Sequence, residues 1–159
     1  MGWRRLPDTL SQAQLWRHIC EEAVEYKQSE PAHASILHST ILSHRSFESS
    51  LAFILANKLD SPWCINAVAL MALFQQVFRE EPDIIDAAVA DLLAVHDRDP
   101  ACDRYSQALL YFKGYHAIQA HRISHRLWRL RRRVLALALQ ARMSDVRAPE
   151  GRCCGCEDA

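Results

Sequence analysis

Three histidines lie close together in the second half of the chain, at positions 116, 121 and 125. His121 and His125 are four residues apart, so on a helix they share one face, which suggests a metal site or a general base. A zinc site needs three or four ligands, however, and the sequence has no His-Glu-x-x-His pattern. We therefore expect His116, His121 and His125 to pack on a helix beside Trp128, and predict neither metal binding nor catalysis there.

The last residues contain a second group that could do chemistry, Cys153, Cys154 and Cys156. Thiolates bind soft metals or become oxidised, but three sulfurs within four residues do not readily form a closed tetrahedral site. We predict a disordered tail over residues 147–159, because the segment shows no hydrophobic periodicity. We favour an alternative or out-of-frame ending without a selected role, and leave metal binding by the tail open.

A dense group of arginines is the third candidate: Arg122, Arg126, Arg129, Arg131, Arg132 and Arg133. Such a basic patch can bind nucleic acid or anionic lipid. The segment from Arg79 to Asp99, however, holds seven acidic and two basic residues, so an acidic helix can neutralise the basic one within or between subunits. No known nucleic-acid module is recognisable. We expect a solvated or subunit-facing surface, with neither nucleic acid nor a membrane as partner.

The elements that carry these residues read as helices throughout. The chain has 159 residues, only 4 of them glycine, with hydrophobic residues making up 50%. That composition favours one all-α domain of about six or seven helices. Apolar spacing predicts helices that begin near Asp8 or Thr9, Pro31, Ser46, Cys64, Pro82, Tyr105 and Arg132, with boundaries at 60–62 and 99–100.

Three finer expectations follow from the same pattern. The helix over 64–78 is nearly all apolar and should be the most buried. The helix over 105–130 should be the longest, and Gly114 inside it should pack closely against a neighbour, because glycine costs about 0.8–1 kcal/mol relative to alanine there.

No run of eighteen apolar residues and no secretory leader is present, so the expected compartment is the cytoplasm.

Two segments carry a family resemblance that extends over residues 15–146. They are Arg98-Asp99-Pro100-Ala101 within residues 98–106, followed by residues 110–128, and residues 43–59. Together they closely resemble the N-terminal helical domain of serine O-acetyltransferase. That enzyme transfers the acetyl group of acetyl-CoA to the serine hydroxyl, on the way to cysteine. The resemblance implies a helical domain over 1–146, which in the family also joins two trimers into a hexamer.

The resemblance assigns Asp99 to the serine pocket, where a carboxylate can accept a charge-assisted hydrogen bond from the substrate ammonium. Taken alone, Asp99 reads as the cap of the helix after Pro100, and the two roles can coexist. The family's general base, a His–Asp dyad, and its acetyl-CoA groove belong to a left-handed β-helix that would follow Val146. Residues 147–152 do not match it, so we predict no catalytic residue, no cofactor and no bound acetyl-CoA in these 159 residues.

Three interpretations remain at this stage. The first is a truncated serine acetyltransferase that is inactive alone; whether the truncation is biological stays open. The second is a helical module that associates with itself or with full-length subunits. The third is a basic protein that binds RNA or membrane. Whichever holds, we expect the chain alone to be a monomer or a weak dimer, because trimer formation in the family relies heavily on the β-helix. The family's sulfhydrylase partner is not expected, because the C-terminal peptide that binds it is missing.

Overall fold

The computed structural model describes residues 10–61 and 65–147, and within these ranges every regular element is helical. This confirms the all-α prediction. The elements follow one another as α1 Gln12–Ser29, a 3₁₀ turn Pro31–His33, α2 Ala34–Leu37, a π-helical turn His38–Leu42, α3 Phe47–Leu59, α4 Ala67–Glu80, α5 Asp83–Arg98, α6 Tyr105–Tyr111, α7 Lys113–Arg129 and α8 Arg133–Arg147.

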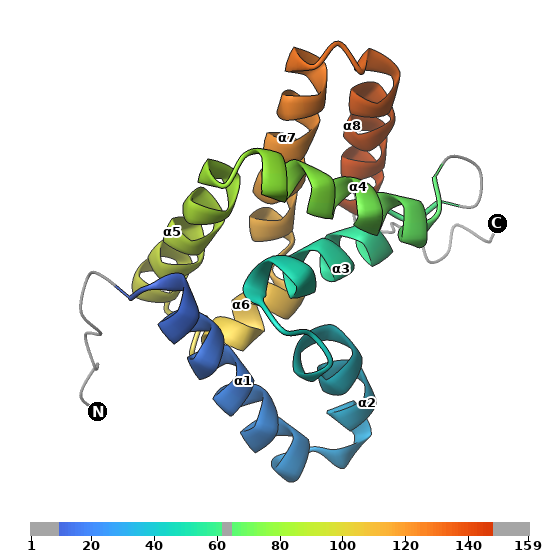
Figure 1. The fold of residues 1–159 in the computed structure, drawn as a ribbon. Coiled ribbons are helices and arrows are strands. Elements are labelled where there is room, and N and C mark those ends of the chain that lie inside the picture. The colour runs from blue at the N-terminus through green and yellow to red at the C-terminus, as the bar shows by residue number, and fades with distance from the viewer. Residues whose placement is uncertain (1–9, 62–64, 148–159) are drawn as a thin grey trace, which may run out of the picture.

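The helices pack around one continuous core, to which nearly every helix contributes (Figure 1). On α1, an apolar stripe faces this core, and its residues Leu15, Ile19 and Ala23 are fully buried. α7 and α8 lie side by side as a hairpin that extends beyond the other helices. None of the helices in the described part of the chain is long and apolar enough to cross a membrane.

The start of α3 agrees with its local sequence signal, and the start of α1 differs from the predicted one. Ser46 caps α3, as predicted, by accepting a hydrogen bond from the Ser49 amide. The first helix was predicted to begin at Asp8 or Thr9. Instead Ser11 is its cap, in a reciprocal capping box with Gln14, so that a Ser-x-x-Gln pattern gave the better signal.

The single long helix predicted over 105–130 is wrong, because Phe112 takes extended backbone angles of φ −78° and ψ 100° between α6 and α7. Gly114 therefore lies in the first turn of α7 rather than inside a helix. It does not pack closely either, since a Cβ placed there would meet nothing within 4 Å. The periodicity runs through the break because α6 and α7 both bury one face in the same core.

Among the described helices, the one with the most buried residues is α3 rather than the predicted segment 64–78. α3 buries eight of its 13 residues, whereas α4 buries four of 14 and leaves Val68 80% exposed. α4 lies across α3 on the outside of the fold (Figure 1). An apolar composition alone does not distinguish a central helix from one that covers it.

Candidate functional site

Asp99 lies in the turn that connects α5 to α6, where it ends α5 with extended angles of φ −96° and ψ 109°. Its carboxylate Oδ1 accepts a hydrogen bond from the Ala101 amide at 2.9 Å, and its carbonyl accepts one from the Cys102 amide at 2.9 Å. Asp99 thus closes a tight turn and does not cap the next helix, which begins four residues after Ala101. Within the described residues its second carboxylate oxygen makes no hydrogen bond.

The cap of α6 comes instead from α1. Glu22 accepts hydrogen bonds from the amides of Tyr105 at 3.3 Å and Ser106 at 2.7 Å. One turn further along α1, Glu25 pairs with Arg104 at 2.6 Å. A carboxylate at a helix N-terminus satisfies free amides and interacts well with the helix dipole. Nothing local in the sequence indicates this cap, because Glu22 lies 83 residues before Tyr105.

Further contacts fix the loop between Asp99 and α6. The Tyr105 ring stacks on His96 of α5 with 4.2 Å between ring centroids. Gln107 reaches back into the loop, donating to the Ala101 carbonyl at 3.3 Å and accepting from the Asp103 amide at 3.1 Å. These contacts hold the Asp99 carboxylate in place without using its second oxygen. The site is therefore preorganised.

A groove of about 730 Å³ opens beside this loop, between the end of α5 and the start of α7. Its charged lining residues are Asp91, Arg98, Asp99 and Lys113, and its apolar walls include Val95, Pro100, Phe112 and Ile118. The break at Phe112 creates the α7 side of the groove, because it turns the first residues of α7 towards Asp99. Asp99 beside the cations Arg98 and Lys113 fits a small zwitterion better than an apolar ligand.

At one wall of the groove, α5 and α7 are joined by a charge network centred on Asp91. One Asp91 oxygen accepts hydrogen bonds from Arg122 and from Gln119, the latter at 2.9 Å. Burial would raise the pKa of Asp91, but these hydrogen bonds outweigh it and the pKa is lowered. Glu81 pairs with Arg126 at 2.7 Å in the same way. The acidic segment thus neutralises the basic helix within one subunit, one of the two arrangements predicted from the sequence.

The three histidines take different positions. His116 is buried, its Nε2–H donates to the Leu109 carbonyl at 2.7 Å, and burial lowers its pKa to about 4. His121 and His125 are exposed on α7 with ring centroids 6.5 Å apart. The described residues contain no group of three or more His, Cys, Asp or Glu side chains placed to hold a metal. Cys153, Cys154 and Cys156 lie outside the described residues.

The described residues thus form an all-α domain that holds a carboxylate on a hydrogen-bonded turn beside a charged groove. Comparison with known proteins identifies the family to which this domain belongs. Residues 15–120 match the family described as "Serine acetyltransferase, N-terminal". The serine acetyltransferase of Haemophilus influenzae is 45% identical over 130 residues, covering 82% of this chain and 48% of the relative. Serine acetyltransferase 5 of Arabidopsis thaliana is 51% identical over 134 residues, covering 84% and 43%.

Solved structures agree with the sequence comparison. Soybean serine acetyltransferase complexed with serine superposes with a TM-score of 0.82 at 50% identity, covering 85% of this chain and 55% of that one. The Neisseria gonorrhoeae enzyme gives a TM-score of 0.80 at 50% identity, covering 83% and 52%. The chain therefore belongs to the serine acetyltransferase family and contains its N-terminal helical domain. It spans about half the length of the curated relatives it matches.

Proposed function

We propose that this chain supplies the serine-facing helical half of a serine O-acetyltransferase, with Asp99 accepting a hydrogen bond from the substrate ammonium. The free carboxylate oxygen of Asp99 in a preorganised groove is the observation that carries the proposal. The soybean relative, whose solved structure is described as complexed with serine, supports it at 50% identity. Transfer of the acetyl group from acetyl-CoA would then serve cysteine biosynthesis.

We further propose that the 159 residues do not catalyse this transfer by themselves. The serine hydroxyl must lose a proton as it attacks the thioester, and an oriented histidine usually accepts that proton. His116, the buried histidine of the described residues, donates its Nε2–H to a backbone carbonyl. It also lies outside the set of residues that line the Asp99 groove. Among the described residues, those that line the Asp99 groove include no histidine, so the groove offers a binding group without a histidine base in its lining.

The activity test follows thioester absorbance with acetyl-CoA and serine, using the purified 159-residue chain. The expected result is no turnover above a blank without serine. Serine-dependent turnover that disappears in Asp99→Asn would show that these residues contain the chemistry, and would overturn the inactivity half of the proposal. Turnover that persists in Asp99→Asn would point to a contaminating enzyme and would call for further purification.

Serine binding is tested separately, by following the backbone amides of Ala101, Cys102 and Gly114 by NMR during titration. The affinity should be weak, because a single exposed ion pair contributes about 0–1 kcal/mol. Asp99→Asn should abolish the shifts, whereas Asp103→Asn, which removes an exposed carboxylate from the same loop, should not. N-acetylserine lacks the ammonium and should leave the amides unmoved. Equal shifts with serine and N-acetylserine would contradict the assignment of Asp99.

We give second place to the alternative of a helical assembly module, because the relatives are named as enzymes. Co-expression with a full-length relative tests it, and recovery of a mixed oligomer would raise it to first place. For the chain alone we propose a monomer or weak dimer. A stable trimer by light scattering would contradict that state.

A further inference from the structure

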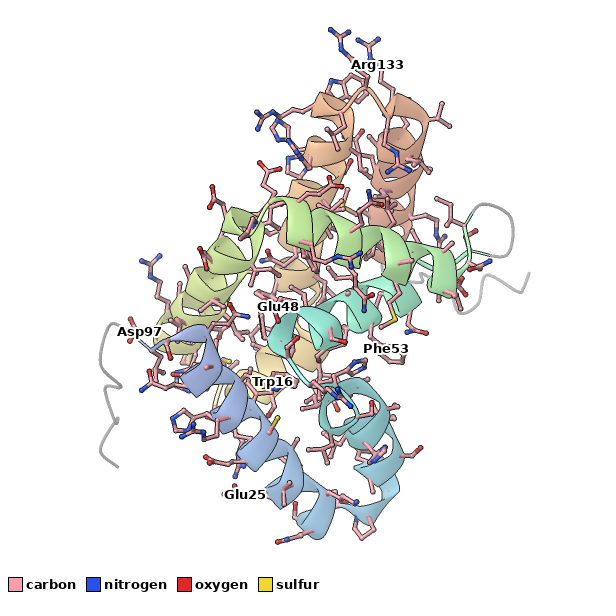
Figure 2. The ribbon with its side chains drawn as sticks, viewed as in Figure 1. Trp16, Glu25, Glu48, Phe53, Asp97 and Arg133 are labelled. Carbon is pink, nitrogen blue, oxygen red and sulfur yellow. The ribbon has the colours of Figure 1, made fainter. Side chains whose placement is uncertain are left out.

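The turn between α7 and α8 forms the far end of the molecule, where Figure 2 labels Arg133. We call Trp128 to Val134, together with Leu137, the hairpin tip. α7 ends there in a turn whose Arg131 has a positive φ of 61°. The tip carries Arg129, Arg131, Arg132 and Arg133, and no acidic residue occurs between Asp103 and Asp145.

The acidic residues that neutralise α7 reach only part of this arginine group. Asp91 pairs with Arg122, and Glu81 pairs with Arg126 and, at 3.8 Å, with Arg129. Among the described residues, no acidic side chain forms an ion pair with Arg131, Arg132 or Arg133. The expected neutralisation of the basic helix by the acidic one is therefore found for Arg122 and Arg126. It is not found for the three consecutive arginines of the tip, residues 131–133.

Apolar side chains are exposed at the same end. Val134 is 82% exposed and Leu137 is 53% exposed, one turn apart on the outer face of α8. Trp128 and Leu130 are 42% and 40% exposed on the α7 side. The Arg133 guanidinium lies over the Trp128 ring, 5.3 Å from its centroid. A projecting end that combines large apolar side chains with uncompensated arginines is unusual for a solvated surface.

We propose that the hairpin tip docks on an anionic phospholipid surface. Arg131 and Arg132 would contact headgroup phosphates, and their aliphatic stems would lie along the interface. Leu130, Val134 and Leu137 would enter the boundary between headgroups and acyl chains, and Trp128 would lie at the level where aromatic side chains gather. The position of the tip at the end of a hairpin lets it reach a membrane without obstruction from the other helices (Figure 1).

Nucleic acid fits the same surface less well. Arginines at the tip would suit a phosphodiester backbone, but Arg133 covers a face of Trp128 and so hinders base stacking on that face. The exposed Val134 and Leu137 would gain no apolar partner along such a backbone. Lipid uses both the charges and the apolar side chains, whereas nucleic acid uses the charges alone.

The test is co-sedimentation of the full 159-residue chain with vesicles. Phosphatidylcholine vesicles with about 30% phosphatidylserine should bind the protein, and pure phosphatidylcholine vesicles should not. Arg131→Gln with Arg132→Gln should weaken binding about 25-fold, at about fivefold for each arginine near an anionic surface. The matched control removes the same charge elsewhere, with Arg17→Gln and Arg45→Gln, two exposed arginines far from the tip. It should bind like the parent chain.

A second variant separates insertion from simple charge attraction. Val134→Ser with Leu137→Ser keeps every charge and should weaken vesicle binding roughly tenfold, since apolar burial contributes to interfacial affinity. Binding that is unchanged in this variant, or that falls equally in the Arg17 and Arg45 control, would overturn the proposal. Tighter binding to RNA than to the anionic vesicles, measured by fluorescence anisotropy, would replace lipid with nucleic acid as the partner.

Discussion

The two ends of α7 use charged residues in opposite ways. At the N-terminal end, the loop with Asp99 is tied down by Glu22, Glu25, His96 and Gln107, and the adjoining part of α7 is paired with α5 through Asp91. At the C-terminal end, Arg131, Arg132 and Arg133 of the hairpin tip are exposed and have no acidic partner among the described residues. Figure 2 shows Asp97, close to the first end, well separated from Arg133 at the second.

This difference separates charges that stabilise the fold from charges that do not. The free energy of unfolding falls when either partner of a partly buried, hydrogen-bonded ion pair is removed. Exposed charges contribute little to it. Substitutions near the Asp99 loop should therefore change stability strongly, and charge substitutions at the tip should change it little. The predictions below test this contrast, beginning with the largest effect.

The largest effect should come from pH, through His116. Burial lowers its folded pKa to about 4 from an ordinary value of 6.5, so the unfolded chain takes up a proton at a pH where the folded chain does not. The free energy of unfolding should thus fall as pH drops from about 6.5 to about 4, by roughly 3 kcal/mol for this group.

Urea unfolding across this pH range measures that loss. His116→Gln, which retains a donor for the Leu109 carbonyl, should flatten the dependence, and His125→Gln on the exposed face should leave it as in the parent chain. An equally steep loss in His116→Gln would assign the pH dependence to other groups.

The second prediction concerns the pairing of α5 with α7. Asp91→Asn should lower the free energy of unfolding by about 2 kcal/mol, because Arg122 and Gln119 lose a charged acceptor in a partly buried position. Asp97→Asn, an exposed change on the same helix, should stay within about 0.5 kcal/mol of the parent. Chemical denaturation measures both. If the two variants are equally stable, the Asp91 network is not a stabilising contact.

The third prediction concerns the cap that α1 provides for α6. Glu22→Ala should cost about 1 kcal/mol, since the amides of Tyr105 and Ser106 lose their acceptor. Hydrogen exchange should accelerate at those two amides before the rest of the core. Glu21→Ala, one position earlier and exposed, is the matched control and should change neither quantity. Uniform exchange in Glu22→Ala would mean that the cap is not a local restraint on the loop.

The sequence was sufficient to predict local features of the fold. The Ser46 cap and the stop at Asp99-Pro100 both follow from rules that act over a few residues. The family resemblance of residues 98–128 and 43–59 is confirmed by the comparisons. The role of Asp99 in binding remains a prediction.

The features that were missed depend on distant contacts. The break at Phe112 is compatible with an uninterrupted apolar period, so only the packing of α6 and α7 reveals it. Glu22 caps a helix 83 residues away, and no local pattern signals such a partner. Whether a charged residue is neutralised likewise depends on which helix lies beside it. Arg122 and Arg132 belong to the same arginine-rich segment, but only Arg122 has an acidic partner among the described residues, Asp91 of α5.

The smallest predicted effect is a gain in stability at the tip. Arg131 occupies a left-handed conformation with φ 61°, where its amide donates to Trp128 and the next amide donates to Leu127. Glycine adopts this helix-ending conformation without a Cβ penalty, so Arg131→Gly should raise the free energy of unfolding by about 0.5–1 kcal/mol. Arg131→Ala keeps the Cβ and is the matched control, which should stay within about 0.5 kcal/mol of the parent.

The same variant distinguishes stability from lipid binding. Arg131→Gly should unfold at higher urea and yet bind anionic vesicles about fivefold more weakly, because one arginine is lost from the surface that faces the lipid. A glycine variant that is no more stable than the alanine variant would show that the turn is unstrained. A stabilised variant with undiminished vesicle binding would remove Arg131 from the docking surface. Opposite changes in the two measurements would mean that an arginine here serves binding at a small cost to the fold.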